Sequence, residues 1–424
     1  MKLLFHGGRV VDPSQGLDTT ADILVDNGKI ARVGKIAKNR SWQIFDVSGL
    51  VLAPGFVDMH VHLREPGGER KETIQTGSEA AVAGGFTSIA CMPNTDPVND
   101  SPALTRYILE RARQTDLVNV FPIGAVTRGS RGEELAEIGV MYRAGIVAVS
   151  DDGNPIQHHQ LVRRALEYIK LFDIPLIDHC EDRLLAAGGC MNEGAVSTRL
   201  GLRGASRTAE ELHVVRDVML SRITGGRVHI AHVSARESLD WIRQGKRHGA
   251  AVTCEVTPHH FTLIDRDIGD YNTNFKMSPP LREREDVQAM LEGLADGTID
   301  CIATDHAPHT SLEKDTTFEE AANGVIGLET AVSVAVDRLV HGGVISWSRL
   351  VELMSCNPSR ILRLDRGTLR VGAIADITVI DPDRQITVDT AQFKSKSRNC
   401  PFQGWKLRGA PVMTVVSGRI VYHA

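Results

Sequence analysis

The sequence predicts an α/β fold, a TIM-like (β/α)8 barrel with a small β-sandwich domain formed by both termini. Three observations favour this fold. Eight short apolar segments alternate with helical patterns through the middle of the chain, ionisable residues follow five of these segments, and strand-like sequence rich in glycine occupies both flanks. Alternating strands and helices are typical of a parallel barrel, whose active site lies where the strands end.

The predicted barrel strands are short and rich in β-branched residues. Between them, segments such as ETIQTGSEAAVAGG and HQLVRRALEYIKLF repeat apolar residues with the period of a helix. The eight predicted strands span residues 55–63, 87–94, 118–126, 145–153, 174–182, 227–235, 250–260 and 300–309.

The two flanks are expected to form the second domain together. Residues 1–52 and 365–424 contain short strand patterns separated by Gly, Asp and Asn. Neither flank is expected to close a β core alone, whereas together they supply enough strands for a small sandwich. The barrel then occupies residues 53–364.

Composition limits the class of function. The chain has 424 residues, of which 42% are hydrophobic and 24% charged, as in an ordinary globular protein. Its formal net charge of -5 argues against a nucleic-acid or membrane surface and favours a small-molecule partner. The start lacks the features of a secretory signal, and no run approaches the ~20 apolar residues of a membrane span, so a cytoplasmic location is expected. Its seven cysteines never form C-x-x-C, and we interpret most of them as core residues.

Metal-binding residue types gather at the ends of the predicted strands. The first strand runs into DMHVHLREPG, where alternation puts both histidines and the arginine on one face. An isolated H-x-H pair is a weak signal, but four further candidate ligands follow other strands. Nitrogen and oxygen ligands of this kind suit Zn²⁺, and six of them favour two ions. The predicted ligands are His60, His62, Asp152, His179, His232 and Asp305.

Two aspartates are expected to have special roles. Asp152 leaves the fourth strand opposite the first, where it can bridge two ions, although Asp151 remains an alternative by position. Asp305 is predicted to bind metal and to carry a proton as general base and acid. On the sixth strand His232 lies nearer the strand end than the alternative, His229. Structural or polar-loop roles are expected for the histidines at 158, 159, 259, 260 and 306.

An anion site is expected beside the metal site. Arg64 lies just beyond the two histidines of the first strand, and guanidinium groups bind carboxylates in two places. Asn94 and His309 could add hydrogen-bond donors. The residues therefore predict hydrolysis, assisted by metal, of a cyclic amide that carries a carboxylate. The polar loop after the eighth strand is interpreted as a lid, with a variable surface loop as the alternative.

Seven motifs in order resemble those of the bacterial type I dihydroorotases of the amidohydrolase superfamily. They are FVDMHVHLREPG, ACMPNT, VSDDG, DHCED, AHVS, KMSPPLR and IATDHAPH. The resemblance implies reversible hydrolysis of (S)-dihydroorotate to N-carbamoyl-L-aspartate, the third step of pyrimidine (UMP) synthesis, with one or two zinc ions and two expected.

The resemblance also implies positions for the substrate. Arg64, Asn94 and His309 hold its carboxylate, the ring is contacted by Ser278, Asn323 and Gly324, and His62 is a further substrate-binding residue. Many members carry Asn where this chain has Ser278 and Phe-Gly where it has Asn323-Gly324. Hydantoinases and allantoinases bridge their metals with a carbamylated lysine near the end of strand four, and GIVAVSDDG contains none.

Two rival functions remain at this point. One is another cyclic amidohydrolase, a hydantoinase or allantoinase. The other is a catalytically inactive scaffold for an aspartate transcarbamoylase, against which the six ligand residues argue. A homodimer and a complex with aspartate transcarbamoylase are the protein partners that the resemblance suggests.

Overall fold

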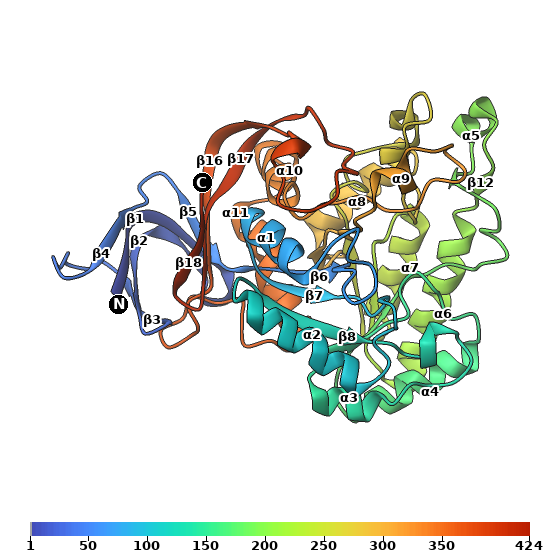
Figure 1. Cartoon of the computed structure of the whole chain (residues 1–424), viewed down its shortest axis with the longest axis horizontal. Coiled ribbons are helices and arrows are strands. Elements are labelled where there is room, and N and C mark those ends of the chain that lie inside the picture. Colours follow the sequence, from blue (N-terminus) through green and yellow to red (C-terminus); the bar gives the residue numbers. More distant parts are fainter. Residues whose placement is uncertain (1) are drawn as a thin grey trace.

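The computed structural model describes residues 2–424 and contains a parallel eight-stranded barrel (Figure 1). All eight predicted strands are present, and neighbouring strands pair in chain order. The barrel closes where Val61 and His306 form a parallel bridge. The strands are β6 (Phe56–Val61), β7 (Phe86–Cys91), β8 (Asn119–Gly124), β9 (Ala148–Val149), β10 (Leu176–Asp178), β13 (Val228–Ile230), β14 (Val252–Val256) and β15 (Cys301–Ile302).

Most of these strands are shorter than the apolar segments that predicted them. The hydrogen-bonded ladder stops before the polar residues, and the backbone then turns across the barrel mouth. His232 and Asp305 have left-handed backbone, with φ of 32° and 48°. Such a conformation is uncommon outside glycine, and here it occurs two and three residues after the ends of β13 and β15. The residues beyond the ladder therefore belong to loops that are anchored by the strands.

Helices surround the barrel (Figure 1). α1 begins at a Thr73 capping box, and the Ser101 side chain accepts from the Leu104 amide to cap α2. No helix within residues 2–424 is long and apolar enough to cross a membrane. The main helices are α1 (Ile74–Ala83), α2 (Pro102–Thr115), α3 (Ile138–Ala144), α4 (His159–Ile169), α6 (Thr208–Thr224), α7 (Arg236–Arg247), α8 (Arg284–Asp296), α10 (Ala331–Ala335), α11 (Trp347–Val351) and α12 (Asn357–Ile361).

Short helices and strands lie in the loops at the barrel mouth and at the end of the eighth repeat. α10 continues in a π-helical turn, Val336–His341, and a second such turn, Glu352–Cys356, links α11 to α12. The remaining short elements of the barrel are α5 (Ala195–Leu200), α9 (Ser311–Lys314), β11 (Met191–Asn192) and β12 (Gly204–Ala205).

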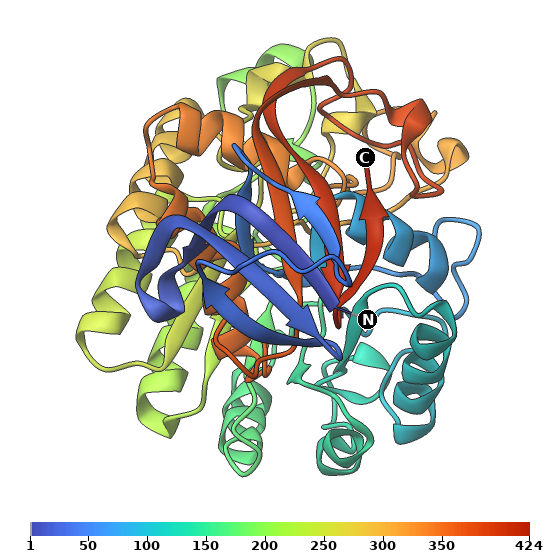
Figure 2. The ribbon, with the colours of Figure 1, turned by 90° about the vertical axis from the view of Figure 1, so that its left-hand side faces the viewer.

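A β-rich region built from both ends of the chain packs beside the barrel, as expected. Hydrogen bonds join its eight strands into one sheet, in which β16 pairs with β5 and β5 with β1. Figure 2 shows the strands of the two ends side by side. Its strands are β1 (Lys2–Asp12), β2 (Leu17–Asp26), β3 (Lys29–Gly34), β4 (Gln43–Asp46), β5 (Val51–Pro54), β16 (Ile377–Thr387), β17 (Lys406–Val416) and β18 (Arg419–His423).

One part of the C-terminal flank leaves this sheet and lies against the barrel. Between β16 and β17, the Ser395 hydroxyl donates to buried Glu72, and buried Asn399 bonds to the loops after β15. The sequence placed residues 365–424 in the small domain, and this segment shows that the flank also supports the barrel mouth.

Candidate active site

The carboxylate of Asp152, three residues beyond the end of the fourth strand, lies among four imidazoles. Its Oδ1 is 3.4 Å from His60 Nε2, 3.6 Å from His179 Nδ1 and 3.7 Å from His232 Nε2. Its Oδ2 is 3.5 Å from His62 Nε2. All five side chains are buried. Asp152 is thus the group that contacts the histidines of the first, fifth and sixth strands together.

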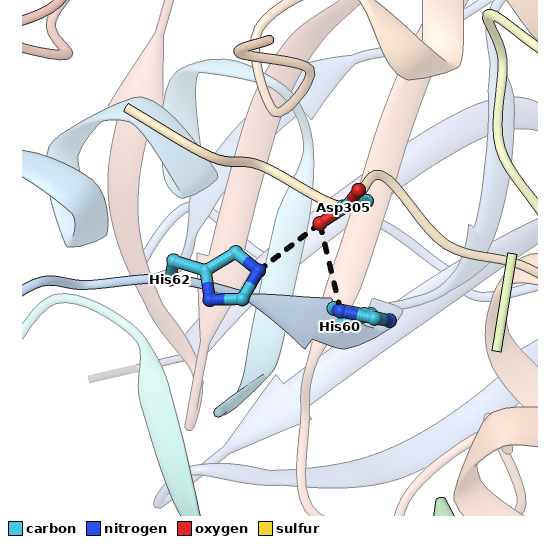
Figure 3. Close-up of side chains that lie close together, drawn as sticks. All are labelled: His60, His62 and Asp305. Atoms are coloured by element: carbon cyan, nitrogen blue, oxygen red, sulfur yellow. Dashed lines mark hydrogen bonds and ion pairs between the residues drawn. The ribbon is translucent and has the colours of Figure 1, made fainter. Parts of the chain in front are cut away.

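Asp305 lies on the other side of the first-strand histidines. Its Oδ1 is 3.0 Å from His62 Nε2 and 3.5 Å from His60 Nε2 (Figure 3). Two sets of ligand atoms each fall within 4.8 Å of one another, and they share His60. The sets are His60, His62 and Asp305, and His60, Asp152 and His232.

The donor atoms of this cluster fit a metal. His60 Nε2 and Asp152 Oδ1 are buried, face one another and make no hydrogen bond within residues 2–424. Buried polar atoms are normally satisfied, so this pair requires a further partner. Imidazole nitrogens and carboxylate oxygens together are ligands for a divalent ion such as zinc. The six predicted residues could hold one ion in each of the two sets, with His179 beside the second.

Both carboxylates of the cluster remain ionised at neutral pH. Burial raises the pKa of each, but the nearby histidines outweigh burial and hold the pKa of Asp152 and Asp305 well below the usual range. Conversely, burial lowers the pKa of His60, but Asp152 and Glu255 raise it above its usual value. The acids are therefore available as anionic ligands or proton acceptors.

Sequence analysis missed Glu255, a fully buried acid in β14. Its Oε1 is 2.7 Å from His60 Nδ1, and its Oε2 is 3.1 Å from His229 Nε2. Burial raises its pKa, but the two histidines outweigh burial and lower the pKa to about 2. Because His60 donates through Nδ1 to this carboxylate, the neutral ring would present its Nε2 lone pair to the cluster. An acid within an otherwise apolar strand was the available signal.

The structure separates the alternatives for ligands. Asp151 turns away from the cluster and accepts hydrogen bonds from the amides of Val126 and Thr127, at 2.9 and 3.1 Å. The ring of His306 lies between Glu72 and the Gly327 amide, in a structural position. His229 lies below the cluster, behind Glu255. Asp151, His306 and His229 therefore lie outside the cluster, and the six predicted residues remain the candidate ligands.

The paired histidines at 158–159 and 259–260 differ from one another. His158 accepts from the Leu161 amide at the start of α4, on the surface, as expected of a polar loop residue. His259 and His260 lie in a turn after β14 but are buried. His260 bonds to Thr257 Oγ1 and to the Pro279 carbonyl, so this pair packs the turn instead of facing solvent.

The predicted substrate residues line a cavity of about 530 Å³ beside the cluster. On one wall Arg64 Nη2 is 3.5 Å from His309 Nε2, which donates to the Asn323 carbonyl oxygen at 2.8 Å. Asn94 Oδ1 accepts from His62 Nδ1 at 2.9 Å, so Asn94 also orients a cluster histidine. The cavity contains the predicted residues His62, Arg64, Asn94, Asp152, His179, His232, Ser278, Asp305, His309, Asn323 and Gly324.

One acid and one base that were not predicted from the sequence, Glu181 and Lys314, shape this cavity. Glu181 accepts from the Ser278 hydroxyl at 3.3 Å and adds a carboxylate to the wall. The Lys314 ammonium donates to three backbone carbonyls, including Ala322 and Gly324, at 2.8 and 3.0 Å. Burial lowers the pKa of Lys314 to about 7. The loop after β15, interpreted as a lid, is thus tied to the barrel from within.

Asn399, from the C-terminal flank, joins two parts of the loop after β15, which carries the predicted substrate residues His309, Asn323 and Gly324. Its side-chain amide donates to the carbonyls of Ala307 and Gly324, both at 3.0 Å, and its Oδ1 accepts from the His309 amide at 3.2 Å. Gly324 has a φ of +127°, and an added Cβ would lie 2.6 Å from that of Ala307. Only glycine fits this close approach.

The position of Glu255 predicts an effect on metal binding. Glu255→Gln keeps the size of the side chain but removes the negative charge that orients His60. We expect zinc affinity, measured by competition with a chromogenic chelator, to fall roughly 10–100-fold while circular dichroism stays unchanged. Glu110→Gln on the surface of α2 is the matched control and should bind zinc like the parent chain. Equal affinities in both variants would contradict the role of Glu255.

Comparisons with known proteins agree with the geometry of the site. Residues 49–238 match a family described as Dihydro-orotase-like, and residues 215–422 match the Amidohydrolase family. In structure, the L-hydantoinase (dihydropyrimidinase) from Arthrobacter aurescens superposes with a TM-score of 0.90, at 27% identity, over 99% of this chain and 96% of its own. The barrel and its β-rich region are therefore shared with cyclic amidohydrolases.

Two curated relatives are much more similar in sequence. The dihydroorotase of Citrifermentans bemidjiense is 54% identical over 425 residues, and that of Pelobacter propionicus is 55% identical over 423 residues. Both alignments cover 100% of each chain. On this full-length identity, the chain belongs to the dihydroorotase family of the amidohydrolase superfamily.

Proposed function

We propose that the protein hydrolyses (S)-dihydroorotate reversibly to N-carbamoyl-L-aspartate and closes the ring in the biosynthetic direction. This is the third step of de novo pyrimidine synthesis, leading to UMP. The observation that carries the proposal is one cavity with a His/Asp cluster beside a wall formed by Arg64, Asn94 and His309. The cluster can act on a cyclic amide, and the wall can bind the carboxylate attached to the ring.

Two zinc ions are the proposed cofactor, and the four histidines and two aspartates of the cluster would hold them. When bound, such ions lower the pKa of water and polarise a carbonyl group. Supporting this proposal, Asp152 contacts all four histidines, and two buried atoms of the cluster lack other partners.

Asp305 is proposed to move the proton. Water adds to the carbonyl carbon of the ring amide, and Asp305 accepts the proton that water loses. The C–N bond then breaks, and Asp305 returns the proton to the departing nitrogen, which leaves a carboxylate and a ureido group. The low pKa of Asp305 keeps it ready to accept a proton before the reaction, and its neighbour His62 holds its Oδ1 at 3.0 Å.

The substrate is proposed to lie with its carboxylate toward Arg64 and its ring toward Ser278 and the Asn323-Gly324 pair. Charge supports this orientation, because the only carboxylate among the described residues on the Ser278 wall is Glu181, which would repel a second carboxylate and accept from ring N–H groups. The guanidinium of Arg64 on the opposite wall suits the one acidic substituent of the ring.

The rival functions are weaker. A hydantoinase shares the fold, but the strand-four residues Ser150, Asp151 and Asp152 include no lysine to bridge metals. An inactive scaffold would not need six complete ligand residues. Association with an aspartate transcarbamoylase, and with a second copy of the chain, remains part of the proposal. Free cysteines throughout residues 2–424 support a reducing compartment, the cytoplasm.

Ring opening and chelation test the proposal directly. The purified, zinc-supplemented protein is expected to consume (S)-dihydroorotate, measured by the loss of its ultraviolet absorbance. Removal of metal should abolish turnover, and added zinc should restore it. Hydantoin and allantoin serve as competing substrates, and faster turnover of either would overturn the assignment.

Replacement of the proton carrier separates chemistry from binding. Asp305→Asn keeps the shape of the side chain but cannot accept a proton, so kcat should fall by roughly 10²–10⁴-fold. Zinc content, measured by atomic absorption, should remain at one ion or more because most ligands are unchanged. An Asp305→Asn enzyme with near-parental kcat would exclude this residue as general base.

Loss of the Asn399 contacts should loosen the carboxylate wall. In Asn399→Ala both carbonyls lose a donor and the His309 amide loses its acceptor, so we expect KM for dihydroorotate to rise about tenfold, or ~1.4 kcal/mol, with kcat and zinc content little changed. Ser397→Ala, two residues away and bonded only to the Lys71 carbonyl through its hydroxyl, is the control. A change in kcat alone would show that Asn399 does not act through substrate binding.

A further inference from the structure

We propose that a second cavity, beside the carboxylate wall, binds a phosphate group, either as inorganic phosphate or in a phosphate monoester. This cavity has a volume of about 560 Å³ and is lined by α9, by residues 396–399 of the C-terminal flank and by Arg70. It is named the outer cavity. Within residues 2–424, none of the six candidate metal ligands lines it, and binding there can be measured without turnover.

Three exposed cationic side chains line the outer cavity, those of Arg70, Lys396 and Arg398. None of them has a carboxylate within 4 Å in the part of the chain that the structure describes. The Lys396 ammonium donates to the Glu69 carbonyl, and the Arg398 guanidinium donates to backbone carbonyls of its own segment. Their charges are therefore not compensated, although the chain as a whole has a formal net charge of -5.

Contacts between two segments bring these cations together. Lys396 reaches the carbonyl of Glu69, the residue before Arg70, and the Ser397 hydroxyl donates to the Lys71 carbonyl at 2.8 Å. Residues 396–398 thus lie along residues 69–71. Like charges held beside one another repel, and an anion bound between them removes the repulsion.

The rest of the lining suits a phosphate better than a cation or an apolar molecule. Asp315, which is exposed, is the only carboxylate among the described lining residues, and Ser311 and Asn274 add neutral polar groups. The Lys314 ammonium is engaged by three backbone carbonyls and is not counted among the free cations. Arginine and lysine beside polar groups are the residues that proteins use for phosphate. The cavity is larger than a phosphate ion, which leaves room for the alcohol of a monoester.

The outer cavity and the active-site cavity share His309, which lines both. Its Nε2 donates to the Asn323 carbonyl, and burial and the charge of Arg64 lower its pKa to about 3, so the neutral ring has an acceptor at Nδ1. This Nδ1 is buried, makes no hydrogen bond within residues 2–424 and lies 3.7 Å from Glu313 Oε2. Buried polar atoms are normally satisfied. Inorganic phosphate and sugar phosphates carry a hydroxyl donor beside their negative charge, whereas sulfate at neutral pH carries none.

The shared histidine predicts that the two cavities influence one another. Asn399 also lines the outer cavity and accepts from the His309 amide at 3.2 Å. An anion in the outer cavity lowers the positive potential at His309 and Arg64, so it should weaken binding of the substrate carboxylate. Coupling between two sites is reciprocal, so dihydroorotate should weaken phosphate binding by the same factor, roughly fivefold. This coupling, unlike phosphate binding itself, rests on the proposed function.

Calorimetric titration of the full, zinc-loaded chain with inorganic phosphate tests the site. Phosphate is expected to bind with a Kd of about 1 mM, and sulfate at equal ionic strength at least roughly tenfold more weakly. Arg70→Gln removes a cation that makes no hydrogen bond within residues 2–424, and it should weaken phosphate binding roughly tenfold. Arg106→Gln, at an exposed arginine of α2, is the matched control and should bind phosphate like the parent chain.

Ribose 5-phosphate distinguishes the two sources of the phosphate group. Tighter binding than that of inorganic phosphate would identify a monoester as the occupant, and equal or weaker binding would identify free phosphate. In either case the affinity should fall in Arg70→Gln. Phosphate binding that Arg70→Gln leaves unchanged, as at the metal cluster, would overturn the proposal, and so would sulfate that binds as tightly as phosphate.

The coupling is tested by ring opening of dihydroorotate. Phosphate should raise KM of the parent chain about fivefold without changing kcat, and Arg70→Gln should lose this response while its KM without phosphate stays parental. An equal rise of KM in Arg70→Gln would show competition inside the active site and contradict the coupling. A chain that binds phosphate through Arg70 but does not turn over dihydroorotate would count against the proposed function and leave the outer cavity supported.

Discussion

The site depends on one constraint, that a single carboxylate must lie within 4 Å of imidazoles from three different strands. Asp152 meets this requirement because the barrel brings the ends of the first, fourth, fifth and sixth strands to one mouth. Two neighbouring strands alone could not do so. The histidines around Asp152 are far apart in the chain, and His60 and His232 are separated by 172 positions. The fold therefore brings these side chains close together, and the loops at the strand ends determine which way each side chain points.

This arrangement explains why much of the site could be predicted from the sequence. A histidine or aspartate directly after an apolar segment is placed by the strand itself, so its neighbourhood follows from the barrel alone. The same logic favours His232 over His229, because the later residue lies beyond the ladder, and in the structure His232 is the one near Asp152. It also explains the ambiguity between Asp151 and Asp152, which leave the same strand end and differ only in which way they point.

The residues that support the site could not be predicted from the positions of the strand ends, for physical reasons. Glu255 lies inside a strand, where its role depends on the ring nitrogen that a distant histidine presents to it. Asn399 lies in the C-terminal flank, which the sequence placed in the other domain, and it acts through hydrogen bonds to backbone carbonyls, which carry no sequence signature. Lys314 was hidden in a polar loop, since burial of an ammonium cannot be recognised without the surrounding carbonyls. Strand-end residues can be recognised locally, whereas the residues that orient them cannot.

The return of the C-terminal flank to the barrel has a consequence for how the protein becomes functional in the cell. All eight barrel repeats are synthesised before Asn399 leaves the ribosome, and domains generally form in the order of synthesis. A nascent barrel would hold its cluster of histidines and aspartates while the wall proposed to bind the carboxylate still lacked the Asn399 hydrogen bonds. Metal loading and substrate recognition would then mature at different times, and a newly made chain would acquire its selectivity last.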